Sequence, residues 1–316
     1  MGEMMPAVDR RLEERFLVHR SSARPIPEIL AEHGQAIRAI ATRGRERTDA
    51  AVIAALPRLE IIANFGVGYD SIDVAAARAR GILVTNTPRV LDDEVADFTV
   101  GLLLATIRQL PQADRYLRAG RWPGEGPFPL TATLRDRTVG LLGMGRIGER
   151  IARRIAAFDV PVLYHARRPR PDVPYRHCPD LLALAREVDT LVAIVPGGAA
   201  TRHLVNAEVL SALGPRGILV NVARGSVVDE AALVAALQAG TILAAGLDVF
   251  ADEPRVPQAL LDLENAVLIP HAGSGTHHTR TIMGNLVVEN LVSWFEGRGP
   301  VTPVPETPWT GRGEGS

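Results

Sequence analysis

Short runs of aliphatic and β-branched residues alternate along the chain with longer alanine- and leucine-rich stretches in which apolar positions recur at helical spacing. This alternation is typical of βα units built around a mostly parallel sheet. Most of the short runs are apolar throughout, as expected of strands that are covered on both faces. The runs predicted as strands are residues 16–18, 37–40, 61–63, 138–142, 162–164, 190–195, 217–222, 244–248 and 267–269. The pattern therefore predicts an α/β fold.

The longest helical patterns, residues 92–117 and 279–295, each predict one helix that joins different parts of the chain. Because 316 residues exceed the usual size of a single hydrophobic core, we expect two domains. Residues 98–285 are expected to form one domain, inserted into a second domain made of residues 1–97 and 286–316. The proline-rich stretch 300–316 is predicted to be a loose terminus.

Composition and charge exclude several classes of protein. Apolar residues make up 47% of the chain and the formal net charge is -1, so neither disorder nor nucleic-acid binding is expected. The longest apolar stretch, near residues 98–107, falls well short of the roughly 20 residues of a membrane span. Cys178 is the single cysteine and no secretory signal is evident, so a cytoplasmic location is expected. Adjacent His277 and His278 lack a carboxylate at ligand spacing, and no metal is expected.

A glycine turn follows the predicted strand 138–142. Gly143, Gly145 and Gly148 have the spacing Gly-x-Gly-x-x-Gly, and a helical pattern begins at Arg146 and Ile147. In a dinucleotide site the first glycine makes the tight turn and the second lets backbone amides approach a pyrophosphate. The third lets the helix pack close to the strand. With its strand and helix in place, the motif predicts a dinucleotide site rather than an ordinary αβ turn.

The end of the next predicted strand bears on the choice of cofactor. An NAD site usually offers an acidic residue about 20 positions after the glycine turn, to bind the ribose 2′-hydroxyl. Here that position reads Ala166, Arg167 and Arg168. A carboxylate would repel a 2′-phosphate, whereas two arginines can bind it. The sequence therefore predicts NADP, with NAD possible; the alternative is that both arginines are simply solvated.

Three later segments each place a polar residue where a predicted strand ends, the edge at which such sheets bind ligands. Arg224 offers a fixed cationic fork for a keto acid carboxylate, His271 can transfer a proton near neutral pH, and Glu253 can hold the imidazole. Taken singly, each has an ordinary structural explanation. Together and in this order they are the groups that reversible hydride transfer to a ketone requires.

The sequence resembles the D-isomer-specific 2-hydroxyacid dehydrogenase family over nearly the whole chain. The matching stretches are residues 64–73 and 86–88, the glycine turn, and residues 221–228, 246–250, 253–254 and 271–274. The resemblance implies a Rossmann-type doubly wound parallel sheet domain inserted into a smaller flavodoxin-like α/β substrate domain. It also implies a homodimer, in which Trp122 could either be core or reach the partner's active site.

The resemblance assigns roles to individual residues. Arg224, Glu253 and His271 are expected to be catalytic, and Val67 and Gly68 to bind the substrate carboxylate through their amides, together with Arg224 and His271. Asp248 is expected to touch the nicotinamide, and Thr106 to lie near the cofactor cleft. The expected cofactor-binding residues are Thr106, Gly143, Gly145, Arg146, Ile147, Gly148, Ala166, Arg167, Arg168, Pro196, Ala223, Asp248 and Gly273.

Within the family, residues 195–198 and the arginines at 167 and 168 look most like NADPH-linked glyoxylate and hydroxypyruvate reductases. The sequence thus predicts reduction of a small 2-keto acid to a D-2-hydroxy acid. Two alternatives stay open: a dehydrogenase of the same family for a bulkier 2-keto acid, and a dinucleotide-sensing binding protein of the corepressor type. One departure is that family members usually open with an apolar strand, whereas a helical pattern over residues 8–16 begins here soon after Met1.

Overall fold

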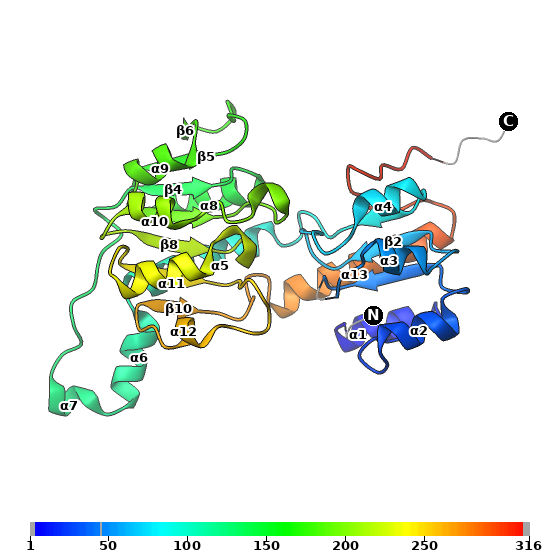
Figure 1. Cartoon of the computed structure of the whole chain (residues 1–316), viewed down its shortest axis with the longest axis horizontal. Coiled ribbons are helices and arrows are strands. Elements are labelled where there is room, and N and C mark those ends of the chain that lie inside the picture. The colour runs from blue at the N-terminus through cyan, green and yellow to red at the C-terminus, as the bar shows by residue number, and fades with distance from the viewer. Residues whose placement is uncertain (1–3, 45, 312–316) are drawn as a thin grey trace. The chain divides into compact units, whose positions relative to one another are not determined.

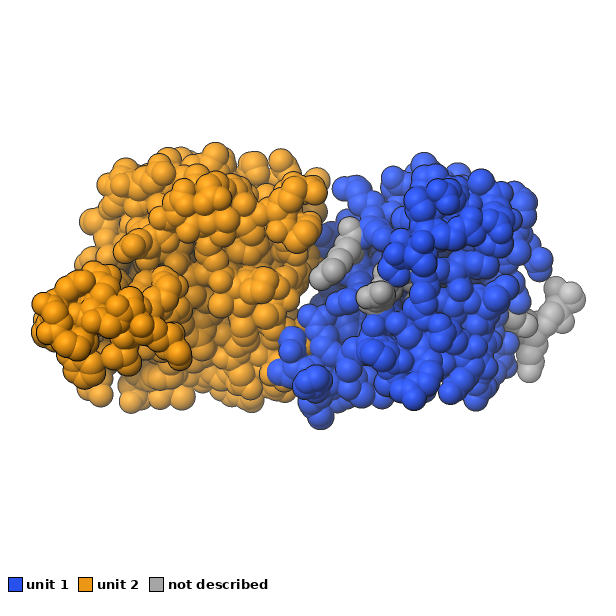
Figure 2. All heavy atoms as spheres, turned by 90° about the horizontal axis from the view of Figure 1, so that it is seen from below, with its two compact units in different colours: residues 1–91, 275–316 blue, residues 92–274 orange. Residues whose placement is uncertain are grey.

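The computed structural model describes residues 4–44 and 46–311. These divide into two compact units, which Figure 2 colours separately. Unit 1 holds the residues up to Leu91 and those from Gly275 onward, and unit 2 is Asp92–Ser274. The boundaries expected from the sequence, after residues 97 and 285, fall inside helices. In the structure the chain passes from unit 1 to unit 2 at Asp92 and returns to unit 1 at Gly275, where helices are about to begin. Each of these helices packs along its length within one unit, which explains the difference.

Unit 2 is built on a seven-stranded sheet in which every pair of neighbours is parallel. Its strands are β4 (Val139–Leu142), β5 (Val162–His165), β6 (Arg176–Cys178), β7 (Thr190–Ala193), β8 (Ile218–Asn221), β9 (Ala244–Leu247) and β10 (Ala266–Leu268). The order β10-β9-β8-β7-β4-β5-β6 runs outward in both directions from β4 and β7. The predicted Rossmann-type doubly wound fold is confirmed, with its switch point between β4 and β7.

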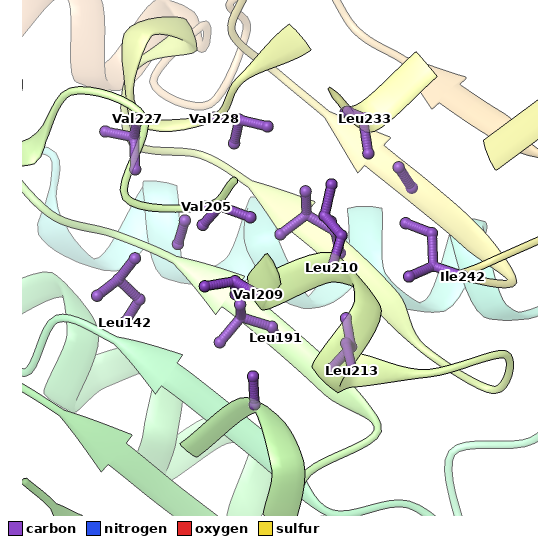
Figure 3. Packing of buried hydrophobic residues seen from close by; sticks show 14 of the residues in the cluster. Leu142, Leu191, Val205, Val209, Leu210, Leu213, Val227, Val228, Leu233 and Ile242 are labelled. Atoms are coloured by element: carbon purple, nitrogen blue, oxygen red, sulfur yellow. The ribbon is translucent and has the colours of Figure 1, made fainter. Parts of the chain in front are cut away.

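Helices cover both faces of this sheet (Figure 1). They are α5 (Asp92–Ile107), α8 (Arg146–Ala156), α9 (Leu181–Glu187), α10 (Ala207–Leu213), α11 (Glu230–Gln238) and α12 (Gln258–Leu261). The unit also contains α6 (Leu110–Arg118) and α7 (Arg121–Glu125), and short 3-10 turns at Ala199–Thr201 and Gly225–Val227. Leu141 packs in a cluster with α5 and α8, whereas its neighbour Leu142 packs in a second cluster with α9, α10 and α11 (Figure 3). This alternation follows from the two-residue period of a strand. It explains why the runs in the sequence are apolar throughout.

Unit 1 is a smaller α/β unit. A three-stranded parallel sheet has the order β1-β2-β3, and the helices lie before, between and after its strands. The elements are α1 (Pro6–Glu13), α2 (Ile26–His33), β1 (Ala39–Thr42), α3 (Ala50–Ala54), β2 (Ile61–Asn64), α4 (Val74–Ala79), β3 (Leu83–Thr85) and α13 (His277–Phe295). The fully buried β2 is the central strand. Polar residues that follow β2 and β3 are thereby held at one edge of this sheet.

The proline-rich C-terminal stretch is not loose as far as the structure describes it, so that prediction is wrong for residues 300–311. Val304 and Thr307 are buried, and the amide of Val304 donates to the Val84 carbonyl at 2.9 Å. The Thr307 hydroxyl accepts from the Val84 amide at 2.9 Å. Residues 312–316 lie outside the described residues. The polar and apolar side chains between the prolines supply contacts that composition alone does not reveal.

Three further expectations differ from the structure. The helix predicted over residues 92–117 is interrupted, because Gln109 adopts a left-handed conformation with φ 50° and a new helix begins beside Pro111. Residues 16–18 are not a strand: Leu17 is 88% exposed, and no described strand pairs with this segment. The short strands β3 and β6 were not predicted.

None of the helices in the described residues is long and apolar enough to cross a bilayer.

Candidate active site

The register of the seven-stranded sheet brings most of the predicted site residues to one edge. Leu142 pairs in register with both His165 and Ala193, and Ala193 pairs with Asn221. Asn221 in turn pairs with Leu247, so the carboxyl ends of these strands are level. The glycine turn, the arginines after β5 and the segments after β7, β8 and β9 therefore all begin at this edge. In an open parallel sheet this is the edge where ligands bind.

The three glycines of the turn have the separate roles expected from their spacing. Gly143 has φ 110°, and a Cβ added there would lie 2.5 Å from the Ile194 carbonyl oxygen. A Cβ on Gly148 would lie 2.4 Å from the Gly143 carbonyl oxygen, so only glycine lets the helix approach the turn this closely. Gly145 precedes α8 and has no atom within 4 Å of its Cβ position. The middle of the turn is therefore open to a ligand.

The first turn of α8 offers backbone amides to that open space. The Glu149 amide is the first to bond back into the helix, donating to Gly145 at 2.9 Å. The amides of Arg146 and Ile147 precede it and face the helix end, where an anion is favoured by the donors and the dipole. The Arg146 guanidinium lies 3.1 Å from the fully buried carboxylate of Asp92. These features fit the pyrophosphate of a dinucleotide.

The residues after β5 differ in how they are engaged. Arg167 and Arg168 are exposed, and no described carboxylate pairs with either of them. Arg170, which was given no role from the sequence, donates to the Met144 carbonyl inside the glycine turn at 2.9 Å and to Glu149 at 3.0 Å. The Ala166 carbonyl accepts from His177 at 2.9 Å. This strand end therefore presents two exposed cations and no carboxylate, while Arg170 braces the turn.

Arg224 follows β8 in an extended conformation and donates from Nη1 to the Ala223 carbonyl at 2.9 Å. The Asn221 side chain braces this segment by donating to the Arg224 carbonyl at 3.0 Å. A Cβ on Gly225 would lie 1.8 Å from the carbonyl carbon of Phe250. Only glycine permits this approach, so the Arg224 segment and the segment after β9 lie directly against each other.

Glu253 and His271 form a hydrogen-bonded pair, with His271 Nδ1 2.7 Å from Glu253 Oε2. Glu253 Oε1 accepts from the Phe250 amide at 3.1 Å. Burial acts to raise the pKa of Glu253, but the hydrogen bond and charge of His271, the Phe250 amide and the charge of Arg224 together hold the pKa below its ordinary value. Glu253 is thus a carboxylate that fixes the imidazole and leaves Nε2 for chemistry.

The backbone at His271 has φ 52°, a left-handed conformation that is costly for a residue with a side chain. Asp248 stabilises it: its carboxylate accepts from the amides of Ala272 at 2.6 Å and Gly273 at 3.0 Å. Burial raises the pKa of Asp248, against the opposing effect of these two amides. Because Asp248 occupies the Gly273 amide, Gly273 can face a cofactor only through its other atoms.

In unit 1, Val67 and Gly68 lie in the loop Phe65–Tyr69 after β2, which we call the carboxylate loop. The Asn64 side chain donates to the Gly66 carbonyl at 3.2 Å and to the Gly68 carbonyl at 3.0 Å. Within the described chain, no protein group accepts a hydrogen bond from the amides of Val67 or Gly68. The loop can therefore offer both amides to an anion.

Comparison with protein families accounts for this combination of features. The family model described as the NAD binding domain of D-isomer specific 2-hydroxyacid dehydrogenases matches residues 100–273. The chain belongs to this family. The resemblance predicted from the sequence motifs is confirmed, and with it an oxidoreductase acting on 2-hydroxy or 2-keto acids.

Individual relatives cover nearly the whole chain. A crystal structure of the NADPH-dependent glyoxylate/hydroxypyruvate reductase of Sinorhizobium meliloti, in complex with NADP and malonate, is 52% identical. It superposes with a TM-score of 0.94 over 98% of this chain and 97% of that chain. Glyoxylate/hydroxypyruvate reductase A of Arabidopsis thaliana is 45% identical over 96% of this chain and 97% of its own length. A 2-ketogluconate reductase of Gluconobacter oxydans is 42% identical over 95% of this chain and 96% of its own.

Thr106, one of the residues expected at the cofactor site of this 2-hydroxyacid dehydrogenase, is buried within α5. Its hydroxyl donates to the Leu102 carbonyl at 2.8 Å, and a Cβ on Gly246 would lie 2.4 Å from that hydroxyl. Gly246 is the penultimate residue of β9, so Thr106 packs against this strand, and its role at the cofactor site stays a prediction. In contrast, Pro196 and Ala223 follow the ends of β7 and β8 at the edge.

Several residues that shape the site have no signal in the sequence strong enough to predict them. Asn64, Asn86 and Thr87 hold the carboxylate loop, Asp92 binds Arg146, and Arg170 braces the glycine turn. Asn64 and Asn86 lie within stretches that match the family, but a match does not say what a side chain contacts.

No group of three or more His, Cys, Asp or Glu side chains in the described residues could hold a metal ion.

Proposed function

We propose that this dehydrogenase reduces small 2-keto acids such as glyoxylate and hydroxypyruvate to D-2-hydroxy acids with NADPH. The observation that carries the proposal is the 2.7 Å contact between His271 and Glu253 at the sheet edge that also holds Arg224 and the glycine turn. The names of the relatives support the substrate class. We assign dinucleotide binding to unit 2 and substrate binding to unit 1.

In the proposed reaction the reduced nicotinamide, when bound, supplies a hydride to the carbonyl carbon. The carbonyl π bond breaks and protonated His271 gives its proton to the oxygen, so an alcohol forms without free alkoxide. Glu253 keeps the imidazole oriented through its hydrogen bond to Nδ1. Arg224 binds the carboxylate and polarises the carbonyl, and the amides of Val67 and Gly68 bind the carboxylate. Preorganised donors of this kind lower the barrier because charge develops where they point.

The decisive test is a substrate panel combined with removal of the proton donor. Wild-type protein should oxidise NADPH with glyoxylate or hydroxypyruvate. His271→Ala should lower kcat at least ~10²-fold, which is the usual contribution of a general acid. His278→Ala is the matched control, because this exposed histidine lies in the first turn of α13 and has no proposed role. Near-normal turnover in His271→Ala would overturn the assignment.

The same panel distinguishes the alternatives. The 2-ketogluconate reductase among the relatives supports a bulkier 2-keto acid as a second candidate substrate. A higher kcat/KM for 2-ketogluconate than for glyoxylate would favour it. Turnover with none of the keto acids, despite dinucleotide binding, would favour a sensing protein instead.

The proposed preference for NADPH depends on the three residues that follow β5, which are Ala166, Arg167 and Arg168. Hydrogen bonds to a charged group contribute about 1.5–3 kcal/mol, so replacing both arginines by alanine should lower kcat/KM for NADPH about 10–100-fold. The value for NADH should stay nearly constant. Arg186→Ala, an exposed arginine on α9, is the control. A wild-type preference for NADH would refute the assignment.

We propose a homodimer on the basis of an apolar arm formed by α6, α7 and the chain that follows, which Figure 1 shows standing away from the sheet. Leu110, Leu117 and Trp122 are each more than half exposed, and Leu130 is fully exposed. Such clustered exposure in one segment is typical of an interaction surface. Trp122→Ser with Leu130→Ser should shift the mass measured by light scattering from dimer to monomer. Leu17→Ser, an exposed leucine in unit 1, should not.

A cytoplasmic location is proposed from the sequence alone. Cys178 is the single cysteine, so no intrachain disulfide can form.

A further inference from the structure

The three central carbonyl oxygens of the carboxylate loop, those of Gly66, Val67 and Gly68, are held by donors from neighbouring segments. Asn64 Nδ2 donates to the carbonyls of Gly66 and Gly68 at 3.2 Å and 3.0 Å. The Thr87 amide donates to the Gly66 carbonyl at 2.9 Å, and Asn86 Nδ2 donates to the Val67 carbonyl at 2.9 Å. Three consecutive carbonyls of the loop are therefore accounted for within unit 1.

These bonds determine where the loop amides point. In a trans peptide the C=O and the following N–H point in opposite directions. The Gly66 carbonyl faces Thr87 and Asn64, so the Val67 amide points away from them. The Val67 carbonyl faces Asn86, so the Gly68 amide points away from Asn86. Consecutive amides that turn outward in this way form an anion-binding concavity.

Asn86 is itself held by the C-terminal segment. The Thr302 hydroxyl donates to the Asn86 carbonyl at 2.6 Å, and the Asn86 amide donates to the Thr302 carbonyl. Asn290, fully buried on α13, accepts from the amides of Val301 and Thr302, both at 2.9 Å, and donates to the Thr302 hydroxyl at 2.9 Å. A continuous chain of hydrogen bonds thus joins α13 to the Val67 carbonyl.

We infer that Asn86, braced by Thr302, is a positioning residue that sets the Gly68 amide for carboxylate binding. The inference rests on the proposed function, in which this loop binds the substrate carboxylate. Asn86 does not reach the reacting atoms, because its amide nitrogen is engaged by the backbone. Its loss should therefore weaken carboxylate binding while leaving the chemical step intact.

The test measures binding and turnover separately. Malonate titrated calorimetrically into the NADPH-loaded protein probes the carboxylate loop without needing a reaction. Asn86→Ala should raise the malonate Kd and the KM for glyoxylate about 10–100-fold. The reason is that the Gly68 amide is no longer held in place to donate to the ligand carboxylate. The values of kcat and of KM for NADPH should stay within about twofold. Asn86→Asp, which replaces the donor by a negative charge, should lose more.

Asn265→Ala is the matched control, because Asn265 Nδ2 also holds backbone carbonyls, those of Leu237 and Leu243, but in unit 2. It should bind malonate as wild type does. If Asn86→Ala fails to fold, Thr302→Val carries the test, with a smaller rise in malonate Kd expected at unchanged kcat. Wild-type malonate affinity in a folded Asn86 or Thr302 variant overturns the inference. So does an equal loss in Asn265→Ala. Failure of the wild type to reduce any keto acid refutes the proposed function instead, and the malonate titration still decides the inference.

Discussion

Replacing Glu253 by glutamine removes the charge from the catalytic pair while preserving its shape. The glutamine carbonyl oxygen can still accept from the Phe250 amide, which lies 3.1 Å from Oε1. Its amide nitrogen would then face His271 Nδ1, at the position where Oε2 now lies 2.7 Å away. Two donors would meet there. The substitution therefore loses both the hydrogen bond that orients the imidazole and the negative charge beside it.

The size of the effect follows from the exposure of the pair. A hydrogen bond to a charged group contributes about 1.5–3 kcal/mol when solvent is excluded. The side chains of His271 and Glu253 are 45% and 35% exposed, so screening reduces the contribution to about half. About 1.4 kcal/mol corresponds to a tenfold change in rate. The kcat for glyoxylate reduction should therefore fall about 4–12-fold in the variant, because the proton donor is no longer held in place.

The assay is kcat for reduction at saturating NADPH and saturating glyoxylate. Glu230→Gln is a close control, since the Glu230 carboxylate accepts from the neighbouring Ala251 amide at 2.7 Å but does not touch His271. It should keep the wild-type kcat. A wild-type kcat in Glu253→Gln would refute the proposed role of the carboxylate.

Three further substitutions test individual packing and hydrogen-bond contacts. Gly148→Ala places a Cβ 2.4 Å from a backbone carbonyl of the glycine turn, so KM for NADPH should rise at least about tenfold with glyoxylate affinity unchanged; an unaltered KM would contradict the role of close packing. Arg137→Met removes a buried guanidinium that donates to the Asp189 carbonyl at 2.8 Å. The free energy of unfolding in urea should fall by about 3 kcal/mol, and a fall of less than about 1 kcal/mol would contradict this prediction. Burial and the neighbouring Glu306 raise the pKa of Tyr69 to about 12, so its stabilising contribution is complete below about pH 10 and is lost as pH rises through 12. Tyr69→Phe should flatten that alkaline loss of stability in thermal melts, and an identical loss in both proteins would contradict it.

The central part of the fold could be predicted from the sequence because its signals are local. Strands β4, β7, β8 and β9 are buried on both faces, so each appears as an unbroken apolar run. The glycine turn is likewise a local motif whose backbone requirements are met by a single residue type. Because parallel strands end level, identifying the strands was enough to gather Arg224, Glu253 and His271 at one edge.

Other elements could not be predicted because their signals are weak or overridden. Pro111 is a local signal for the break between α5 and α6, since proline inside a helical pattern ends or kinks a helix. The helical period continues across Gln109, however, and the prediction of one helix followed the period. The three-residue strands β3 and β6 are too short for a periodic pattern. The position of Thr106 likewise depends on how far α5 extends along β9, which residue spacing does not state.

The C-terminal segment shows most clearly what residue patterns leave out. Its composition suggests a loose tail, yet Thr302 bonds to Asn86, 216 residues away, and through it to the carboxylate loop. Bonds of this kind run from a polar side chain to a backbone carbonyl, so they impose no periodicity and no preferred neighbour along the chain. They nevertheless decide which way a peptide group faces, and anion binding depends on that direction. The affinity of this enzyme for its substrate is therefore expected to depend on residues that act only through the backbone of the carboxylate loop.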